Sequence, residues 1–410
     1  MKKIEGIDKL GLGLYFLLCI FAIVNINSVD PVLGKKQFIF FCISLFVGFI
    51  IFCTRNKFFE NMAVIIYIAS ILLLVGLFPF GKEILGQKNW YKFGSFTMQP
   101  VEFAKIGTAL VLANYAAGSD FDIKKNTDYL LISIAIIAIP ALIVLAIPDV
   151  GSLLIFTAFF ITLYREGLSG WLFGIGILFA GVFLISIKVN PLYVIIAITI
   201  ISGLLILLNH DKIIWNIIST LSISGSFLVL CSLAFFSPKV FEKLPKHQRE
   251  RIEVLYEGES KFRETSGYNL LYSKTAIGSG GIWGKGYKEG SVTRGKFVPE
   301  QQTDYIFCTV GEEWGFIGSL LLIIAYVIYI GRIYYLSERQ KNRFNRVFGY
   351  SFASILLLHF CINLGMVMGL FPTVGIPLPY FSYGGSSLLA FSIMTFIFFK
   401  LNYVDHHSLV

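Results

Sequence analysis

The chain has 410 residues, of which 56% are hydrophobic and only 14% are charged, and its formal net charge at pH 7 is +9. Soluble domains carry about 25% charged residues, so this composition, with a mean hydropathy of +0.75, excludes a soluble globular domain. Apolar runs long enough to cross a bilayer recur along almost the whole chain. They predict an all-α polytopic membrane protein and favour a helical bundle over a barrel of short alternating strands.

Twelve apolar segments predict twelve membrane helices. In chain order they lie at 10–27, 36–53, 60–79, 103–117, 129–147, 150–164, 168–188, 192–208, 213–237, 305–331, 348–370 and 384–401. The sixth segment is short and follows Pro148, so the fifth and sixth are expected to form a broken or closely joined pair. The first segment has no small-residue cleavage site at its end, which predicts a retained helix.

The orientation of the helices is predicted from Lys and Arg in the short loops. The basic residues at 2–9 and 332–346 place both termini in the cytoplasm. Residues 238–303, with twelve Lys or Arg and eight Glu, then form one large extracytoplasmic loop of a single membrane domain, residues 1–410. The basic excess of this loop either receives an anionic ligand or faces solvent without a partner.

A glycine run, "GSGGIWGKG" (278–286), stands in that loop. It does not fit a phosphate-binding loop, because Ser279 replaces the first glycine and Gly286 replaces the Ser or Thr that binds magnesium. It does not fit a dinucleotide-binding turn either, because Trp283 takes the place of the last glycine. No nucleotide cofactor is therefore predicted. The run is either a turn that presents backbone amides and Lys285 to an anion or a flexible loop.

Charged residues also enter two apolar segments. In "QPVEFAK" (99–105), Glu102 and Lys105 are three residues apart and share one face of a helix start. The pair either lines a cavity or is an ion pair whose Lys105 extends to the membrane interface. In "AIPDVGS" (146–152), Asp149 is either a cavity residue or the N-cap of the next helix.

The polar stretch "VPEQQTDYIFCTVGEEW" (298–314) leads into the apolar segment 305–331. Asp304, at the mouth of that helix, either caps it or takes part in chemistry. Glu312 lies two turns deeper and about 80° around the helix, and carboxylates inside a membrane are candidates for function.

An uncharged stretch, "GLFPTVGIPLPYFSYGGSS" (369–387), has three prolines and four glycines in nineteen residues between two apolar segments. Irregular backbone at membrane depth is tolerated where it is buried in protein or lines a cavity. The stretch is therefore either a cavity-lining segment or an interfacial loop.

The six cysteines and five histidines do not indicate a metal site. They are scattered along the chain, apart from His406 and His407 near its end, and show none of the close spacings of metal ligands or redox pairs. The cysteines are interpreted as small apolar packing residues.

Five ordered motifs resemble the shape, elongation, division and sporulation (SEDS) family, typified by RodA and FtsW, and the resemblance is closest to its RodA branch. They are "QPVEFAK", "IPDVGS" (147–152), "GYNLLYSKTAIGSGGIWGKG" (267–286), "PEQQTDYIF…GEEWG" (299–315) and "GIPLPYFSYGGSS" (375–387). The family pattern differs at Asn89, Val101, Ser152 and Tyr272, where it has Arg, Ser, Thr and Gln. The family commonly has ten membrane helices, so two of the twelve segments, near 192–237, are interpreted as an inserted pair.

The resemblance implies a peptidoglycan glycosyltransferase that polymerises lipid II during cell elongation, with inversion at the anomeric carbon. It implies the bacterial cytoplasmic membrane as location, with the active site at the outer face, and a class B penicillin-binding protein as transpeptidase partner. Asp304 matches the family's essential aspartate, and it is predicted to be the general base that takes the proton of the acceptor hydroxyl. The other predicted substrate-binding or cavity residues are Glu102, Lys105, Asp149, Lys285, Glu300, Glu312, Ser382, Gly384 and Gly385.

The leaving pyrophosphate needs positive charge, which could come from the basic loop, Lys105 or a divalent cation, magnesium or manganese. Membrane lipids are expected around the helices, and no nucleic-acid partner is predicted. Three other functions remain open: a division-type FtsW-like glycosyltransferase, a flippase or transporter of lipid-linked precursors, and a scaffold that only recruits the transpeptidase.

Overall fold

The computed structural model describes residues 8–55, 57–84, 87–94, 96–208, 217–299 and 301–407. Within these ranges, ten helices are long and apolar enough to cross a membrane. In the described residues, each of the twelve predicted segments coincides with helical structure; positions 213–216 of the ninth segment lie outside the described residues. The two that do not meet the length and hydropathy of a span are 103–117 and 150–164. The prediction of a polytopic helical membrane protein is confirmed.

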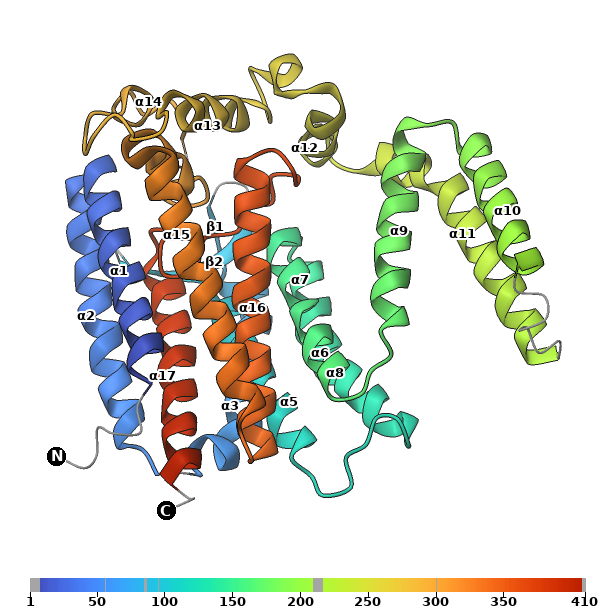
Figure 1. The fold of residues 1–410 in the computed structure, drawn as a ribbon, viewed down its shortest axis with the longest axis horizontal. Coiled ribbons are helices and arrows are strands. Elements are labelled where there is room, and N and C mark those ends of the chain that lie inside the picture. Colours follow the sequence, from blue (N-terminus) through green and yellow to red (C-terminus); the bar gives the residue numbers. More distant parts are fainter. Residues whose placement is uncertain are drawn as a thin grey trace. The chain divides into compact units, whose positions relative to one another are not determined.

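The chain forms two compact units, of which the first consists of residues 1–168 and 257–410. Its helices are α1 (Lys9–Val29), α2 (Pro31–Cys53), α3 (Phe58–Val75), α4 (Leu77–Phe80), α5 (Pro100–Ala116), α6 (Thr127–Ala146), α7 (Val150–Phe156), α8 (Ala158–Arg165), the 3₁₀ helix η3 (Glu259–Phe262), α13 (Tyr268–Ser279), α14 (Ser291–Arg294), α15 (Ile306–Glu338), α16 (Arg343–Val367) and α17 (Gly385–His407). In this unit α1 begins and α17 ends at one end, and α13 and α14 lie at the opposite end (Figure 1).

Short polar residues set the starts of several helices in the first unit. Asp8 accepts a hydrogen bond from the backbone N of Gly11 at the start of α1, and Asn126 and Asn342 cap α6 and α16 in the same way. Asp30 ends α1 and caps α2, whose first residue is Pro31. A side-chain oxygen at this position satisfies amides that have no partner inside the helix, so the chain can reverse sharply between two spans.

A small antiparallel sheet between α4 and α5 was not predicted. Its strands are β1 (Lys82–Ile84), β2 (Gln87–Phe93) and β3 (Phe96–Met98), in the order β1-β2-β3. In β2 and β3 Tyr91 lies opposite Met98 and Lys92 opposite Thr97. Aromatic residues favour strands, but a hairpin this short has no hydropathy signal of its own beside long apolar helices. Asn89 of β2 and Gln99, the N-cap residue of α5, both lie beside the start of α7.

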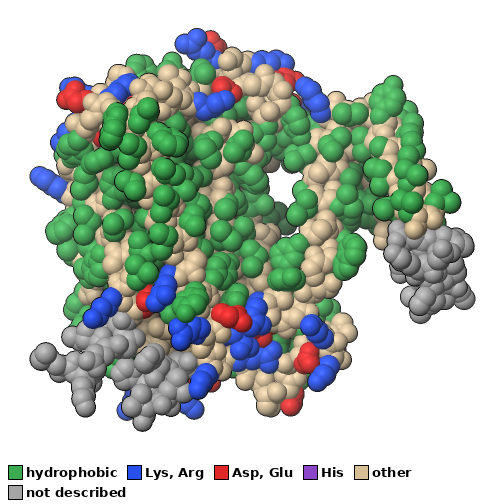
Figure 2. Space-filling view, viewed as in Figure 1, with side chains coloured by type: hydrophobic (Ala, Val, Ile, Leu, Met, Phe, Trp, Pro, Cys, Tyr) green, Lys and Arg blue, Asp and Glu red, His purple; other side chains and the backbone are tan. Residues whose placement is uncertain are grey.

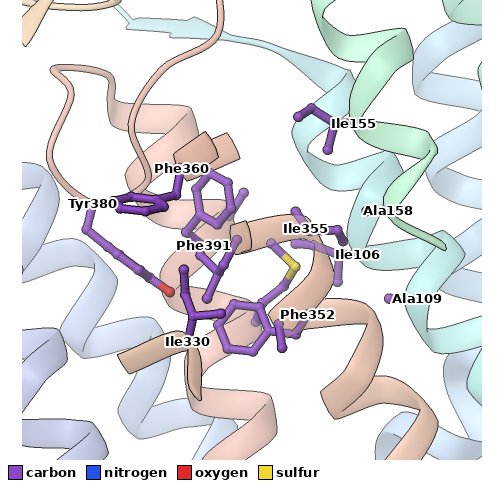
Figure 3. Close-up of a cluster of buried hydrophobic side chains, with 14 of the residues drawn as sticks. Ile106, Ala109, Ile155, Ala158, Ile330, Phe352, Ile355, Phe360, Tyr380 and Phe391 are labelled. Atoms are coloured by element: carbon purple, nitrogen blue, oxygen red, sulfur yellow. The ribbon is translucent and has the colours of Figure 1, made fainter. Parts of the chain in front are cut away.

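The buried centre of the first unit is formed by α5, α16 and α17. Fourteen of the seventeen residues of α5 are buried, and α16 and α17 are far more buried than the other candidate spans. Side chains of α5, α7, α8, α15, α16 and α17 meet in one apolar cluster (Figure 3). On the face shown in Figure 2, hydrophobic side chains cover the middle of this unit, and charged side chains gather at its two ends.

The second unit, residues 169–256, contains α9 (Trp171–Lys188), α10 (Pro191–Leu208), α11 (Ile217–Lys243) and most of α12 (Lys246–Glu257). Its small core is formed by Val182, Val194 and Ala234. The predicted pair 192–237 corresponds to α10 and α11, which pack with α9. The segment 238–303, predicted as a loop between membrane helices, contains helices of its own. In it α11 continues through Pro238, and α12, η3, α13 and α14 follow.

Candidate active site

Asp304 lies in a turn immediately before α15, and Tyr305 takes the N-cap position of that helix. The backbone around Asp304 is held by three successive carbonyl groups. The Gln302 carbonyl accepts from the backbone N of Tyr383 (2.8 Å), that of Thr303 from Ser382 Oγ (2.6 Å), and that of Asp304 from Asn363 Nδ2 (2.8 Å). The position of Asp304 is therefore set by α16 and by the loop that follows it.

The loop 368–384 runs between α16 and α17 and is irregular, and its inner part is buried among the helices. Gly375 in this loop lies against the Asp304 carboxylate: a Cβ placed on it would be 3.2 Å from Asp304 Oδ2. Gly375 also has φ +71°, a conformation that favours glycine. Only a residue without a side chain fits here without strain. The inner part of the stretch is packed inside the protein, and whether it lines a cavity stays a prediction.

Glu102 and Lys105 form a buried ion pair on α5, with 2.8 Å between Glu102 Oε1 and Lys105 Nζ. Lys105 Nζ is also 2.8 Å from Nε2 of His359 on α16, and it lies 5.3 Å from the ring centre of Phe391 on α17. Lys105 has no exposed surface, so its side chain does not extend to the interface. Glu102 Oε2 is buried and has no hydrogen-bond partner among the residues that the structure describes.

Asp149 is the N-cap of α7, as one of its two alternatives predicted. It accepts hydrogen bonds from the backbone N (2.9 Å) and Oγ (2.7 Å) of Ser152. Its Oδ2 also accepts from Asn89 Nδ2 (2.9 Å), so the residue that replaces the family's arginine supports this carboxylate. A Cβ on Gly151, the second residue of α7, would lie 2.6 Å from the Val374 carbonyl oxygen. The start of α7 therefore packs directly on the loop 368–384.

Glu312 is buried in α15 and binds the segment that precedes Asp304. Its carboxylate accepts from Lys285 Nζ (2.7 Å), from the backbone N of Val292 (2.9 Å) and from both the backbone N and Oγ1 of Thr293 (2.8 and 2.7 Å). Val292 and Thr293 belong to α14, so Glu312 holds that short helix against α15. Lys285 is paired with Glu312 in this structure, and any anion would have to share it.

The glycine run 278–286 fills a break in α15. At Gly315, where φ is 65° and ψ is −160°, the helix loses hydrogen bonds, and the run replaces them. The replacements join Phe316 N to Gly281 O (2.9 Å), Ile317 N to Ile282 O (3.2 Å), Lys285 N to Glu312 O (3.0 Å) and Gly286 N to Glu313 O (3.0 Å). A Cβ on Gly280 or Gly284 would lie 2.0 or 2.2 Å from a carbonyl oxygen of α15. The glycines thus permit backbone contact, and the amides of Lys285 and Gly286 are used within the protein.

The last predicted residues lie where α17 begins. Ser382 Oγ accepts from the backbone N of Leu378 (2.8 Å) and donates to Thr303, so it joins the loop 368–384 to the turn before α15. The backbone N of Gly384 donates to Gln37 Oε1 (3.3 Å), and a Cβ on Gly385 would meet the Phe40 ring at 2.7 Å. In this structure all three residues make contacts that set the position of the backbone between the loop 368–384 and the start of α17. Glu300 lies outside the described residues.

The salt bridges of the segment 257–296 use part of its positive charge. Lys274 Nζ lies 2.7 Å from Glu259 Oε1, and this hydrogen bond lowers the pKa of the Glu259 carboxyl group. Lys261 forms a second ion pair, with Glu257.

Comparison with known proteins assigns the family. The model of the cell cycle protein family FtsW/RodA/SpoVE matches residues 7–196 and 183–407. The chain belongs to the FtsW/RodA/SpoVE family. It is 32% identical, over 336 residues, to the peptidoglycan glycosyltransferase MrdB of Escherichia coli K12, covering 81% of this chain and 75% of MrdB.

Two solved structures share the fold of this family. One, a chain from a study of how a peptidoglycan synthase complex coordinates polymerization and crosslinking, has a TM-score of 0.72 and 24% identity, with 98% of both chains covered. The other, RodA of Thermus thermophilus, has a TM-score of 0.63 and 23% identity, with 98% of this chain and 99% of RodA covered. The chain is thus a multi-pass membrane protein with the FtsW/RodA/SpoVE fold.

Two residues that the sequence did not single out connect the family motifs in space. His359 and Asn363 are one turn apart on α16, so they share a face. His359 contacts Lys105, and Asn363 Nδ2 donates to the carbonyl groups of both Asp304 (2.8 Å) and Ile376 (2.7 Å). A histidine and an asparagine inside a strongly apolar segment were the available signal, because polar side chains in membrane helices face the protein interior.

Proposed function

We propose that this chain polymerises lipid II into glycan strands during cell elongation, with Asp304 as the general base. The chain is a peptidoglycan glycosyltransferase of the elongation type, the activity for which its relative MrdB is named. The proposal concerns the substrate, the site residues and the partner. The observation that supports it most is the position of Asp304, a carboxylate on a backbone held by α16 and the loop 368–384.

The chemistry needs one base and a rigid support. The 4-hydroxyl group of the acceptor sugar attacks the anomeric carbon of the donor, whose bond to the lipid pyrophosphate breaks with inversion. Asp304 takes the hydroxyl proton as the new bond forms, a contribution of about 10² to 10⁴ in rate for a general base. Hydrogen bonds to the three carbonyl groups at 302–304 hold the backbone that carries this carboxylate, and a base held in position before the reaction needs less rearrangement.

The leaving pyrophosphate needs positive charge, and the described site residues supply less of it than they supply of the base. Lys105 is buried and paired with Glu102, so we assign it to the support of the site rather than to direct phosphate contact. A divalent cation, magnesium or manganese, would enter with the pyrophosphate oxygens. In the part of the chain that the structure describes, no three His, Cys, Asp or Glu side chains gather as metal ligands. No step is therefore assigned to a metal, and the chemistry needs no nucleotide.

We infer that both termini are cytoplasmic and that the site opens at the outer face of the bacterial cytoplasmic membrane. Basic side chains near the helix ends of the first unit support this orientation. Arg332 pairs with Asp8 at the start of α1, and Arg343 and Arg346 pair with Glu166 at the end of α8. At the opposite end of the unit lie α13 and α14 (Figure 1), and Glu312, which follows Asp304 in the chain and lies on α15, binds the backbone of α14. Polyprenyl tails would stay in lipid while the sugars reach this end.

The proposed partner is a class B penicillin-binding protein, which would crosslink the strands that this chain makes. The support is the likeness in fold to a chain studied as part of a peptidoglycan synthase complex that polymerises and crosslinks.

The test is lipid II polymerisation by purified protein in detergent, since polymer formed without a bilayer is neither transport nor scaffolding. Asp304→Asn keeps the size of the side chain but cannot accept the proton, and we expect turnover to fall by about 10² to 10⁴. Asp120→Asn, in an exposed connection, removes the same charge elsewhere and should keep wild-type turnover. Wild-type turnover in folded Asp304→Asn protein would refute the catalytic role, and no polymer from the wild type would refute the function.

A further inference from the structure

His359 is the buried polar side chain that connects the ion pair to the loop beside Asp304. Its Nε2 lies 2.8 Å from Lys105 Nζ, and its Nδ1 lies 3.1 Å from the carbonyl oxygen of Pro377. Only 2% of His359 is exposed, and its ring meets the ring of Phe391 edge-on, with 5.0 Å between centroids. Each ring nitrogen therefore has a partner within the protein.

The two partners determine the proton on the ring. A lysine ammonium group can only donate a hydrogen bond and a backbone carbonyl group can only accept one. Nε2 is therefore the acceptor, Nδ1 carries the hydrogen, and the ring is neutral with a single tautomer. A neutral histidine held this way joins a donor on α5 to an acceptor in the loop 368–384.

The loop contact lies close to Asp304. Residue 377 accepts from His359 and residue 376 accepts from Asn363, one turn further along α16. Asn363 also holds the backbone of Asp304, and Gly375, the preceding loop residue, lies against the Asp304 carboxylate. The position of residues 375–377 along α16 thus sets the space that the Asp304 carboxylate occupies.

We propose that His359 is a positioning residue for the transfer reaction, through the juxtaposition of Lys105, the neutral His359 ring and the Pro377 carbonyl. Its hydrogen bonds keep residues 375–377 at a fixed position relative to the buried ion pair. Because Gly375 lies against the Asp304 carboxylate, this position determines where the carboxylate lies. The proposal rests on the proposed function for its effect on turnover. Its structural part, the link between His359 and the loop, stands apart from that function.

Three variants separate the two hydrogen bonds. The δ atoms of asparagine reach the place of Nδ1, so His359→Asn can keep the Pro377 bond and loses the Lys105 bond. The ε atoms of glutamine reach the place of Nε2, so His359→Gln can keep an acceptor for Lys105 and loses the Pro377 bond. His359→Leu loses both. Because Asn and Gln are polar replacements that each keep one bond, the test does not depend on whether the Leu variant folds.

Turnover with lipid II is the first measurement. We expect kcat to fall about tenfold in each single-bond variant, the factor that corresponds to about 1.4 kcal/mol of transition-state stabilisation, and further in the Leu variant. KM should stay near the wild-type value, because the change affects the reacting geometry rather than substrate binding. Wild-type kcat in both the Asn and Gln variants, or a rise of KM alone, would overturn the proposal.

Hydrogen exchange is the second measurement and needs no substrate. In the wild type the amides of Leu378 and Tyr383 are bonded to Ser382 Oγ and the Gln302 carbonyl, and those of Val292 and Thr293 are bonded to Glu312. His359→Gln should speed exchange at 375–383 and leave 292–293 unchanged. Unchanged protection at 375–383, or equal loss at both places, would overturn the link, whether or not the wild type polymerises lipid II.

Discussion

Replacing Gly375 by alanine tests whether the loop 368–384 positions Asp304. The added Cβ has two effects. At φ +71° it costs about 1–2 kcal/mol of folding free energy, the usual penalty of a left-handed conformation. It would also lie 3.2 Å from Asp304 Oδ2, closer than an ordinary contact, so the carboxylate must move by a few tenths of an ångström.

The second effect should appear in catalysis. A displacement of about 1 Å at a reacting group can lower the rate about 10²-fold, and the smaller shift here should lower kcat about tenfold, equivalent to about 1.4 kcal/mol. Lipid II polymerisation per folded molecule measures this effect, and thermal unfolding of the same samples in detergent measures the first.

Gly94 provides the matched control. It has φ +60°, but nothing lies within 4 Å of a Cβ placed there. Gly94→Ala should therefore lose a similar amount of stability and keep wild-type turnover. If the two variants had equal turnover per folded molecule, the contact between Gly375 and Asp304 would have no part in catalysis and the reasoning would be refuted.

Two further predictions concern the ion pair and the orientation. Lys105→Met leaves the Glu102 carboxylate buried without its ammonium partner and should lower the free energy of unfolding by about 3–5 kcal/mol; adding Glu102→Gln should restore much of that stability without restoring activity, and a double variant no more stable than the single one would contradict this. In a cysteine-free background, Glu289→Cys should react with an impermeant thiol reagent on intact spheroplasts and Lys125→Cys only after permeabilisation. Both wild-type side chains are well exposed, and the reverse labelling order would show the opposite orientation.

The sequence predicted most of the helices and part of the site. Long apolar segments determine where helices form in a membrane, because every backbone polar group there must be satisfied inside the protein. Spacing on one helix also predicted the pairing of Glu102 with Lys105. Contacts between distant segments were not predictable in this way. Lys285 and Glu312 are 27 residues apart, and His359 and Lys105 lie on different helices, so no periodicity connects them.

The glycine run shows a different reason for incomplete prediction. Its glycines were examined as a nucleotide-binding turn and as an anion-binding turn, since those are the common uses of exposed backbone amides. Its contact with α15 depends on a break at Gly315, and no residue type in "GEEWG" requires such a break. The cause of the glycine pattern is therefore a neighbouring backbone that the sequence does not place beside it.

The hydrogen bonds between the glycine run 278–286 and the break in α15 restrict how many residues the run can contain. Surface loops usually accept added residues at little cost, but here Gly281, Ile282, Lys285 and Gly286 each bond to a fixed position on both sides of the break. One residue inserted between Ile282 and Lys285 would separate the donors from the acceptors and leave helix backbone groups unpaired. An insertion next to Gly258, where a side chain would meet open space, would disturb no such pairing. Natural or engineered changes in length should therefore be tolerated near Gly258 and rejected inside the glycine run 278–286.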